Sequence, residues 1–324
     1  MQPKKFPQPR PISVSRKPKS KSQKSSAPKA DAHEGRVVET VGRCVNVRNP
    51  AGDRICYLSG QRAVVGDLVK FVDAPGMGGK LSEVLPRQTE LKRRDPRGKE
   101  RILAANLKGI IIVATPQQPE FNAGLVARYL VAASVSGLEA AICLNKADLE
   151  ASEEVRSELS LWKSLGFTVL ETSTKSGLGL TALTDFLSSE SAVGSPWSLV
   201  GLSGVGKTSI VSMLLPNQDV GPIGEISEHW DQGKHTTTHS TIFELPEGGE
   251  LCDSPGIRTF TPAGLEPETI RDHFPGFTAV HCRFRDCLHR EDEAGCVAER
   301  EVASSLLVSY RRLLDYVTQH ERTY

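Results

Sequence analysis

A glycine-rich loop in the second half of the chain constrains the fold more than any other sequence feature. Residues 201–208 read GLSGVGKT, which fits the pattern G-x-x-x-x-G-K-[ST] and lies between an apolar run and a helical pattern. Glycines let backbone N–H groups turn toward phosphate oxygens, and the N-terminus of the following helix adds partial positive charge. The motif therefore predicts a phosphate-binding loop that joins a strand to a helix in an α/β sheet.

Side chains of this loop have separate expected roles. Lys207 would reach the β- and γ-phosphates of a nucleotide, and the Thr208 hydroxyl would coordinate Mg²⁺. The alternative, an ordinary glycine-rich turn, is disfavoured by the position between a strand and a helix. The predicted phosphate-binding residues are Gly201, Leu202, Ser203, Gly204, Val205, Gly206, Lys207, Thr208 and Ser209.

A second motif indicates which base the nucleotide carries. Residues 145–148 read NKAD and follow the apolar run AAICL, at the sheet edge where ligands of open α/β sheets bind. The Asp148 carboxylate, expected to be buried, would accept two hydrogen bonds from guanine, whereas adenine presents an acceptor at N1 and an ATPase is therefore disfavoured. By itself, Asp148 would be explained equally well as a helix N-cap. The predicted base-binding residues are Asn145, Lys146, Ala147, Asp148, Ser173, Thr174 and Lys175.

Two further loops would sense the γ-phosphate. Asp253, which opens the segment DSPG, would hold Mg²⁺ through water, and the N–H of Gly256 would meet the γ-phosphate. The segment GKHTTTH supplies hydroxyls for the same metal, that of Thr237 among them. Taken singly, each segment could be an ordinary turn.

Hydrolysis lacks one expected group. Many GTPases place a water-orienting glutamine directly after D-x-x-G, but this chain has Ile257 there, so we expect slow intrinsic turnover. His239 is the candidate catalytic residue that would replace it, and an ordinary loop histidine is the competing interpretation.

A Cys/His cluster near the C-terminus predicts a metal site. Its pattern is Cys282-x4-Cys287-x-His289-x6-Cys296. Three thiolates and one imidazole form a closed tetrahedral set, which is typical of structural Zn²⁺, while a redox pair is the main alternative. The adjacent His281 could serve as a ligand, but His289 would then be unexplained. The other four cysteines lie singly among apolar residues and are interpreted as small buried side chains.

Hydrophobic patterning divides the 324-residue chain into segments. Short β-branched runs within 36–91 predict a small β-barrel or sandwich, and strand–helix alternation after a polar, basic connector predicts an open, mainly parallel sheet. A single helix is expected over 298–320. The predicted domains are a disordered basic tail (1–34), a β domain (35–92), an α/β domain (93–261) and a helical zinc-binding domain (262–324).

Charge is distributed unevenly along the chain. Residues 1–30 carry nine Lys/Arg and no acidic residue, which leaves 31 basic against 39 acidic residues in the remainder. Such an arm is typical of contacts with nucleic-acid phosphates, and a solubilising tail is the alternative; six prolines disfavour a transit peptide.

No apolar run approaches the roughly 18 residues of a membrane span, and there is no secretory signal. We therefore expect a cytoplasmic protein without a membrane partner.

The order of the motifs resembles that of the circularly permuted GTPases. NKAD, TSTK, GLSGVGKTS, KHTTTH and DSPG form the usual set with its last two elements moved to the front. The preceding β domain and the following Cys/His cluster narrow the resemblance to the RsgA (YjeQ) family, over residues 35–324. It implies an OB-fold barrel, a central circularly permuted P-loop GTPase domain and a C-terminal helical zinc-binding domain. It also favours His289 as the zinc ligand, although the spacer before Cys296 is one residue longer than the family form.

The resemblance further implies a ribosome-stimulated GTPase that acts late in 30S maturation. Its partners would be the 30S subunit, 16S rRNA and GTP or GDP, and we expect a monomer. Ordering of the DSPG loop would reposition the zinc-binding domain, so that hydrolysis drives release. Two alternatives stay open: a GTP-regulated RNA-binding module with incidental turnover, and a permuted GTPase that acts on another ribosomal or tRNA target.

The basic connector is the candidate RNA contact, because the β domain offers only Tyr57 and Phe71 for base stacking. Its basic residues would bind RNA phosphates, and a solvated linker is the alternative interpretation. These residues are Lys92, Arg93, Arg94, Arg97, Lys99 and Arg101.

Overall fold

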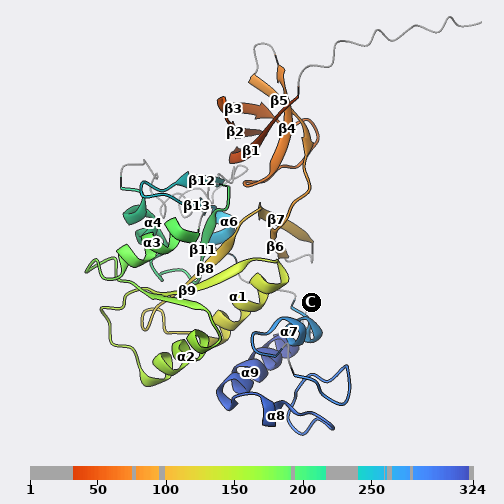
Figure 1. Ribbon diagram of the computed structural model, residues 1–324, viewed down its shortest axis with the longest axis vertical. Helices are drawn as coiled ribbons and strands as arrows, with labels where there is room; N and C mark the ends of the chain where they lie inside the picture. Colours follow the sequence, from red (N-terminus) through yellow and green to blue (C-terminus); the bar gives the residue numbers. More distant parts are fainter. Residues whose placement is uncertain are drawn as a thin grey trace, which may run out of the picture.

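The computed structural model describes residues 32–74, 78–94, 99–190, 194–216, 240–258, 260, 265–277 and 280–320. The arm at 1–31 and the predicted site residues Thr237 and His239 lie outside the described residues. Figure 1 shows a β-barrel above an α/β sheet, with a helical module below the sheet. The arrangement confirms the predicted multidomain fold class.

The N-terminal domain is a five-stranded closed barrel. Its strands follow the order β1-β2-β3-β5-β4, and β1 pairs again with β4 to close it. The inward side chains include Val37, Val47, Phe71 and Leu81, each at most 1% exposed, and they form a core of their own. The strands are β1 (Ala32–Val41), β2 (Cys44–Asn49), β3 (Gly52–Tyr57), β4 (Leu68–Ala74) and β5 (Gly78–Val84). Residues 32–34, predicted to belong to the tail, are therefore part of a strand.

The predicted polar connector is instead a β-hairpin. Strands β6 (Glu90–Arg94) and β7 (Glu100–Ala105) pair antiparallel, with Leu91 opposite Ala104. Leu91 is 1% exposed and Ala104 is fully buried, so these two residues anchor the hairpin to the core. The many charged residues around them hide this signal in the sequence.

A mainly parallel sheet forms the centre of the molecule. Its strand order is β10-β9-β8-β11-β13-β12, and β12 runs antiparallel to β13. The strands are β8 (Gly109–Ala114), β9 (Glu139–Leu144), β10 (Thr168–Glu171), β11 (Trp197–Val200), β12 (Ser240–Glu244) and β13 (Glu250–Asp253). Every residue of β8 is buried, as expected for a central strand that is covered on both faces.

Helices cover both faces of this sheet. Ile110 and Ile112 of β8 belong to the core under α1 (Ala123–Val135) and α2 (Glu153–Ser164). The alternate residues Ile111 and Val113 belong to the core under α3 (Leu180–Glu190) and α4 (Lys207–Leu214). This period-two division confirms the strand–helix alternation expected from the sequence.

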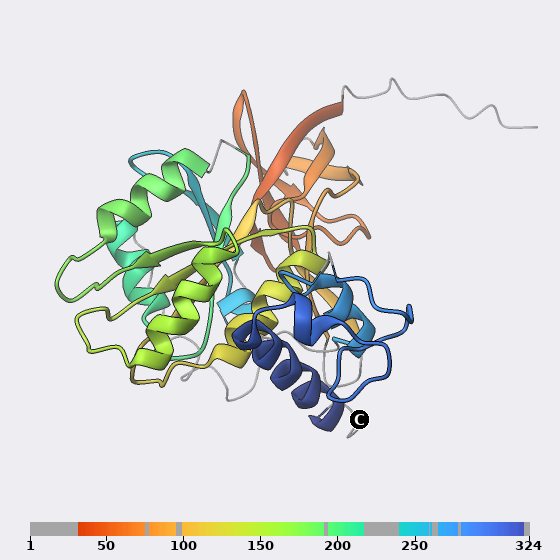
Figure 2. The ribbon, with the colours of Figure 1, turned by 60° about the horizontal axis from the view of Figure 1, so that its bottom comes forward.

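The C-terminal module comprises short helices around one longer helix. These are α7 (Pro267–His273), α8 (Ala298–Glu301) and α9 (Ser304–His320), whereas α6 (Pro255–Arg258) packs against β11 and β7. The predicted single helix over 298–320 is wrong, because the backbone of Val302 is extended and its side chain is buried in the core. Figure 2 shows the module beside α1, and residues of α7 and α9 share a hydrophobic core with α1 and α2. None of the helices in the described ranges is both long and apolar enough to cross a bilayer.

Candidate nucleotide-binding site and metal centre

The predicted motifs meet at one edge of the sheet. Asn145 follows β9, Thr172 follows β10 and Gly201 follows β11, while Asp253 is the last residue of β13. These four strands are parallel, so their carboxyl ends lie on the same side. Segments more than 100 residues apart in the sequence therefore line one site, where ligands of α/β sheets bind.

The phosphate-binding loop requires glycine at two positions. Gly201 has a φ of 142°, and a Cβ there would lie 2.3 Å from the Val113 carbonyl oxygen. Gly206 has a φ of 92°, and its Cβ would lie 2.3 Å from Nδ2 of Asn145. The loop thus crosses directly over β8 and against the NKAD segment, and any side chain at these positions would push it away.

Lys207 begins α4 and lies over the loop. Its ammonium donates to the carbonyl oxygens of Gly201 (2.7 Å) and Leu202 (2.6 Å), and the residue is only 8% exposed. Val205 is buried, Thr208 is half-buried, and Ser203, Gly204 and Ser209 are exposed. The charge that would meet the phosphates is therefore already held at the helix N-terminus.

Asn145 joins the glycine-rich loop to the predicted base-binding segments. Its Nδ2 donates to the Val205 carbonyl (2.9 Å), and its Oδ1 accepts from the Thr172 hydroxyl (3.2 Å). Asn145 and Thr172 are both fully buried, so this bridge is shielded from water. Thr172 belongs to the quoted TSTK motif, but sequence reasoning assigned it no role, although its position directly after a strand was the available signal.

Asp148 is exposed, so the expectation that it is buried is wrong. It lies in the turn beyond β9, and its Oδ1 accepts from the Ser173 hydroxyl at 2.6 Å. That hydrogen bond is the main cause that lowers the pKa of Asp148, and the charges of Lys175 and Lys146 add to it. The carboxylate is therefore ionised at neutral pH and has further lone pairs for N–H donors. Thr174 is half-buried beside this pair.

The Asp148→Asn variant is expected to lose its preference for guanine. An amide offers one donor and one acceptor, so it cannot accept both guanine N–H groups, but it can face the C2 carbonyl of xanthine. Competition binding with GTP, XTP and ATP measures the change. Asp185→Asn on α3, at another exposed carboxylate, is the matched control. Unchanged strict guanine preference in Asp148→Asn would refute the assignment.

The DSPG segment lies beside the phosphate loop. Asp253 is half-buried at the end of β13, the direct neighbour of β11, and Gly256 lies in α6. Ile257 is 1% exposed and belongs to the hydrophobic core. Its side chain thus points into the protein, and no water-orienting group can come from this position.

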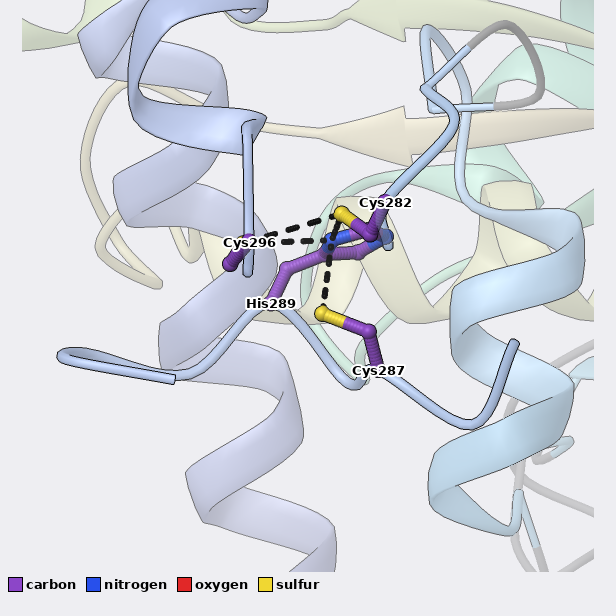
Figure 3. A group of neighbouring side chains, drawn as sticks. All are labelled: Cys282, Cys287, His289 and Cys296. Carbon is purple, nitrogen blue, oxygen red and sulfur yellow. Dashed lines mark hydrogen bonds between the residues drawn. The ribbon is translucent and has the colours of Figure 1, made fainter. Parts of the chain in front are cut away.

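The predicted metal ligands form a compact cluster, shown in Figure 3. Cys282, Cys287, His289 and Cys296 offer ligand atoms that all lie within 4.8 Å of one another. Nδ1 of His289 is 3.4 Å, 3.7 Å and 3.6 Å from the sulfurs of Cys282, Cys287 and Cys296, and the sulfurs of Cys282 and Cys296 are 3.8 Å apart. His281 is exposed and does not belong to the cluster.

These separations match a tetrahedral metal site. Metal bonds of about 2.3 Å to sulfur and 2.0 Å to nitrogen require S···S of about 3.8 Å and S···N of about 3.5 Å. A disulfide would need sulfurs about 2.05 Å apart, and all seven cysteines are free, so the redox-pair alternative is not what the geometry shows. The cluster can therefore hold one metal ion.

The surrounding residues hold the ligand loop in place. The Glu293 carboxylate accepts from the backbone N–H groups of Leu288 and Arg290, and the Tyr310 hydroxyl donates to the Leu288 carbonyl. Burial lowers the pKa of His289, which favours the neutral imidazole that a metal needs. Burial also raises the pKa of the Cys287 thiol to about 12, so metal binding must release a proton there.

Comparisons with known proteins agree with this geometry. The family model of the RsgA GTPase matches residues 84–262. The chain is 37% identical over 301 residues to the small ribosomal subunit biogenesis GTPase RsgA of Chromohalobacter salexigens, covering 89% of this chain and 85% of the relative. It is 38% identical over 308 residues to the protein of the same name from Pseudomonas syringae pv. syringae, covering 89% and 82%.

Solved structures support the same fold. The crystal structure of YjeQ from Thermotoga maritima superposes with a TM-score of 0.69 and 26% identity, covering 89% of this chain and 99% of that one. The structure of YloQ, a circularly permuted GTPase, gives a TM-score of 0.66 at 21% identity, covering 91% and 98%. The latter comparison bears on fold alone.

Proposed function

This chain belongs to the RsgA GTPase family, and from that membership we propose that it is a small-subunit-stimulated GTPase acting late in 30S maturation. In this proposal it binds 16S rRNA in the cytoplasm as a monomer and hydrolyses GTP to GDP and phosphate, which drives its release. The observation that carries the proposal is the buried Asn145 bridge, because it unites the phosphate loop with the guanine-binding segments. A site for phosphates alone would not need it.

The residues at the sheet edge divide the work of binding. Lys207 would contact the β- and γ-phosphates, and Asp148 and Ser173 would hold the base. The Thr208 hydroxyl, in the first turn of α4, would coordinate Mg²⁺, and Asp253, at the end of β13, would hold it through water. Bound Mg²⁺ would neutralise the charge on the β- and γ-phosphates.

A second candidate function is favoured by Ile257. Because this side chain is buried, the isolated protein lacks a water-orienting group there, as expected for a GTP-regulated RNA-binding module with incidental turnover. In our proposal the missing group is supplied when the subunit binds, and His239 is the candidate within this chain. Undiminished subunit-stimulated turnover in His239→Ala would exclude that candidate.

Turnover measured with separated ribosomal subunits tests the proposed function. We expect slow GTP hydrolysis by the protein alone and a rate at least 10-fold higher with 30S subunits, as expected when a missing catalytic group is supplied. The 50S subunits should have no such effect. Equal rates in all three conditions would favour the RNA-binding module, and stimulation by 50S subunits or tRNA would favour a permuted GTPase with another target.

We propose that rRNA phosphates bind at the β6–β7 hairpin. Arg93 lies directly opposite Arg101 on the paired strands, so the two basic residues are neighbours on one face of the hairpin and could contact adjacent phosphates. Arg62, Lys99 and Arg101 line a hollow of about 450 Å³ beside it. In the barrel Phe71 is buried and Tyr57 is 39% exposed, so base stacking there depends on one described aromatic residue.

The double variant Arg93→Ala/Arg101→Ala is expected to weaken 30S binding. Loss of two phosphate contacts should lower the slope of log affinity against log salt concentration by about 2. Affinity measured at several salt concentrations gives this slope. Lys70→Ala, which removes a half-buried lysine paired with Glu83 on the barrel, is the control and should leave the slope unchanged. An unchanged slope in the double variant would place the contact elsewhere.

We propose that the Cys/His cluster holds one structural Zn²⁺. We also propose that the GTP-bound protein binds the 30S subunit more tightly than the GDP-bound protein. The sequence led us to expect that the DSPG loop repositions the zinc-binding domain, but the helical module shares a core with α1 and α2, and repositioning would break this packing. We propose instead that the module moves together with the sheet when the subunit is released. Equal 30S affinity in the GTP and GDP states would contradict a release driven by hydrolysis.

A further inference from the structure

We propose that Arg36, a residue of the barrel, is a positioning residue for the γ-phosphate-sensing loops. Together with β1 it holds β12, which follows one of those loops, and β13, which leads into the other, and so makes the barrel part of the nucleotide-sensing apparatus. The inference rests on the proposed GTPase function.

Strand β1 extends the central sheet beyond its edge. Thr40 pairs with Ser240 and Glu39 pairs with Thr241, at the beginning of β12. Thr241 in turn pairs with Asp253 on β13. Glu39, Thr241 and Asp253 therefore form one row across three hydrogen-bonded strands, from the barrel to the residue predicted to hold Mg²⁺ through water. Figure 1 shows β1 next to β12, with β13 on the other side of β12.

A bulge lets β1 serve both domains. The residues up to Arg36 pair with β4 of the barrel, and the register against β2 shifts between Val37 and Glu39. Beyond that shift, Glu39 and Thr40 pair with β12. Bulges bend a strand and re-aim its following residues, which here directs β1 out of the barrel and onto the sheet.

A buried ion pair fixes the other end of β13. Arg36 donates through both terminal nitrogens to the Glu250 carboxylate, at 2.7 Å for the Nη1–Oε2 pair. The side chains are 11% and 1% exposed, and the backbone N–H of Gly194 donates to the same carboxylate at 3.0 Å. Glu250 is the first and Asp253 the last residue of this short strand. Because a buried charge must be paired, Arg36 fixes where β13 begins and hence where Asp253 lies.

A change in the position of β13 should alter the affinity for GTP more than the affinity for GDP. The α- and β-phosphates and the base contact the loops after β11, β9 and β10, none of which pairs with β1. GTP adds the γ-phosphate, which would depend on the N–H of Gly256 and on Mg²⁺ held through Asp253, and GDP lacks this phosphate. A displacement of the barrel should therefore change GTP affinity selectively, and by linkage GTP should change the affinity of any ligand that shifts the barrel.

The test compares Arg36→Ala with Arg87→Ala. Arg87, in the segment between β5 and β6, makes a similar bidentate pair with the fully buried Asp67, at 2.6 Å and 2.9 Å, and neither residue belongs to β1, β12 or β13. We expect Arg36→Ala to weaken binding of a non-hydrolysable GTP analogue about tenfold, with GDP affinity unchanged within about twofold. Arg36→Lys should recover part of the loss. Arg87→Ala should leave the ratio of analogue to GDP affinity unchanged.

A second variant distinguishes a positioning role of Arg36 from a loss of folding caused by an unpaired buried charge. Arg36→Met/Glu250→Gln removes both charges without leaving a buried carboxylate unpaired, and should show the same selective loss. Equal loss of GDP and analogue affinity, or the same selective loss in Arg87→Ala, would overturn the proposal. Failure of the unaltered protein to bind either nucleotide would instead contradict the proposed function.

Discussion

Lys207→Ala is expected to weaken GTP binding about a hundredfold and to reduce hydrolysis below detection. Lys207 is the only charged residue of the loop over residues 201–208. Its ammonium lies within 2.7 Å of the carbonyl oxygens of Gly201 and Leu202. Charge-assisted hydrogen bonds contribute about 1.5–3 kcal/mol each, and about 3 kcal/mol corresponds to a hundredfold change in affinity. Titration with a fluorescent GTP analogue measures the loss.

Lys108→Ala is the matched control for this variant. Lys108 directly precedes β8 at the opposite edge of the same sheet, and its side chain is 24% exposed. Its loss should not change nucleotide affinity, because no predicted phosphate contact lies at that edge. An Lys207→Ala protein that is folded and binds GTP normally would show that the glycine-rich loop is a structural turn.

Removal of the metal is expected to unfold the C-terminal module. Structural Zn²⁺ sites contribute about 10–16 kcal/mol of binding free energy, as much as the whole stability of a typical domain. Two residues of α9 hold the ligand loop: the Tyr310 hydroxyl donates to the Leu288 carbonyl, and Arg311 donates to the His289 carbonyl. The Tyr310 ring also stacks on Phe277, with 4.4 Å between the ring centroids. Loss of the metal should therefore release α9 as well.

Metal analysis and limited proteolysis measure this effect. We expect one zinc per chain, which Cys287→Ser lacks, and rapid cleavage within the module after chelation. Zinc affinity should fall with decreasing pH, because protons compete for the thiolates. Cys44→Ser, at a half-buried barrel cysteine outside the cluster, should keep both zinc and protease resistance. A chelated protein with unchanged resistance would contradict a structural metal.

The parts of the site that the sequence predicts well are those set by local chemistry. Gly201 and Gly206 need a positive φ and Lys207 must open a helix, so the pattern itself specifies a strand, a loop and a helix. The cluster from Cys282 to Cys296 is likewise confined to one short segment. Ligand chemistry restricts its residue types, and the structure brings all four side chains together.

Contacts between distant segments are what the sequence does not predict. The hairpin depends on burial of Leu91 against Ala104, and the break after α8 depends on burial of Val302. The exposure of Asp148 depends on how far its turn extends beyond β9, and Arg36 meets Glu250 across 214 positions. No spacing rule relates such pairs, because only the folded sheet brings them together.

A crystal structure with a non-hydrolysable GTP analogue tests the central claim that these shuffled segments form one guanine-nucleotide site. We predict that the phosphates contact the backbone of Gly201–Lys207 and the Lys207 ammonium, and that the base lies between Asp148 and Ser173. Nucleotide bound elsewhere, or a base that does not contact Asp148, would contradict it.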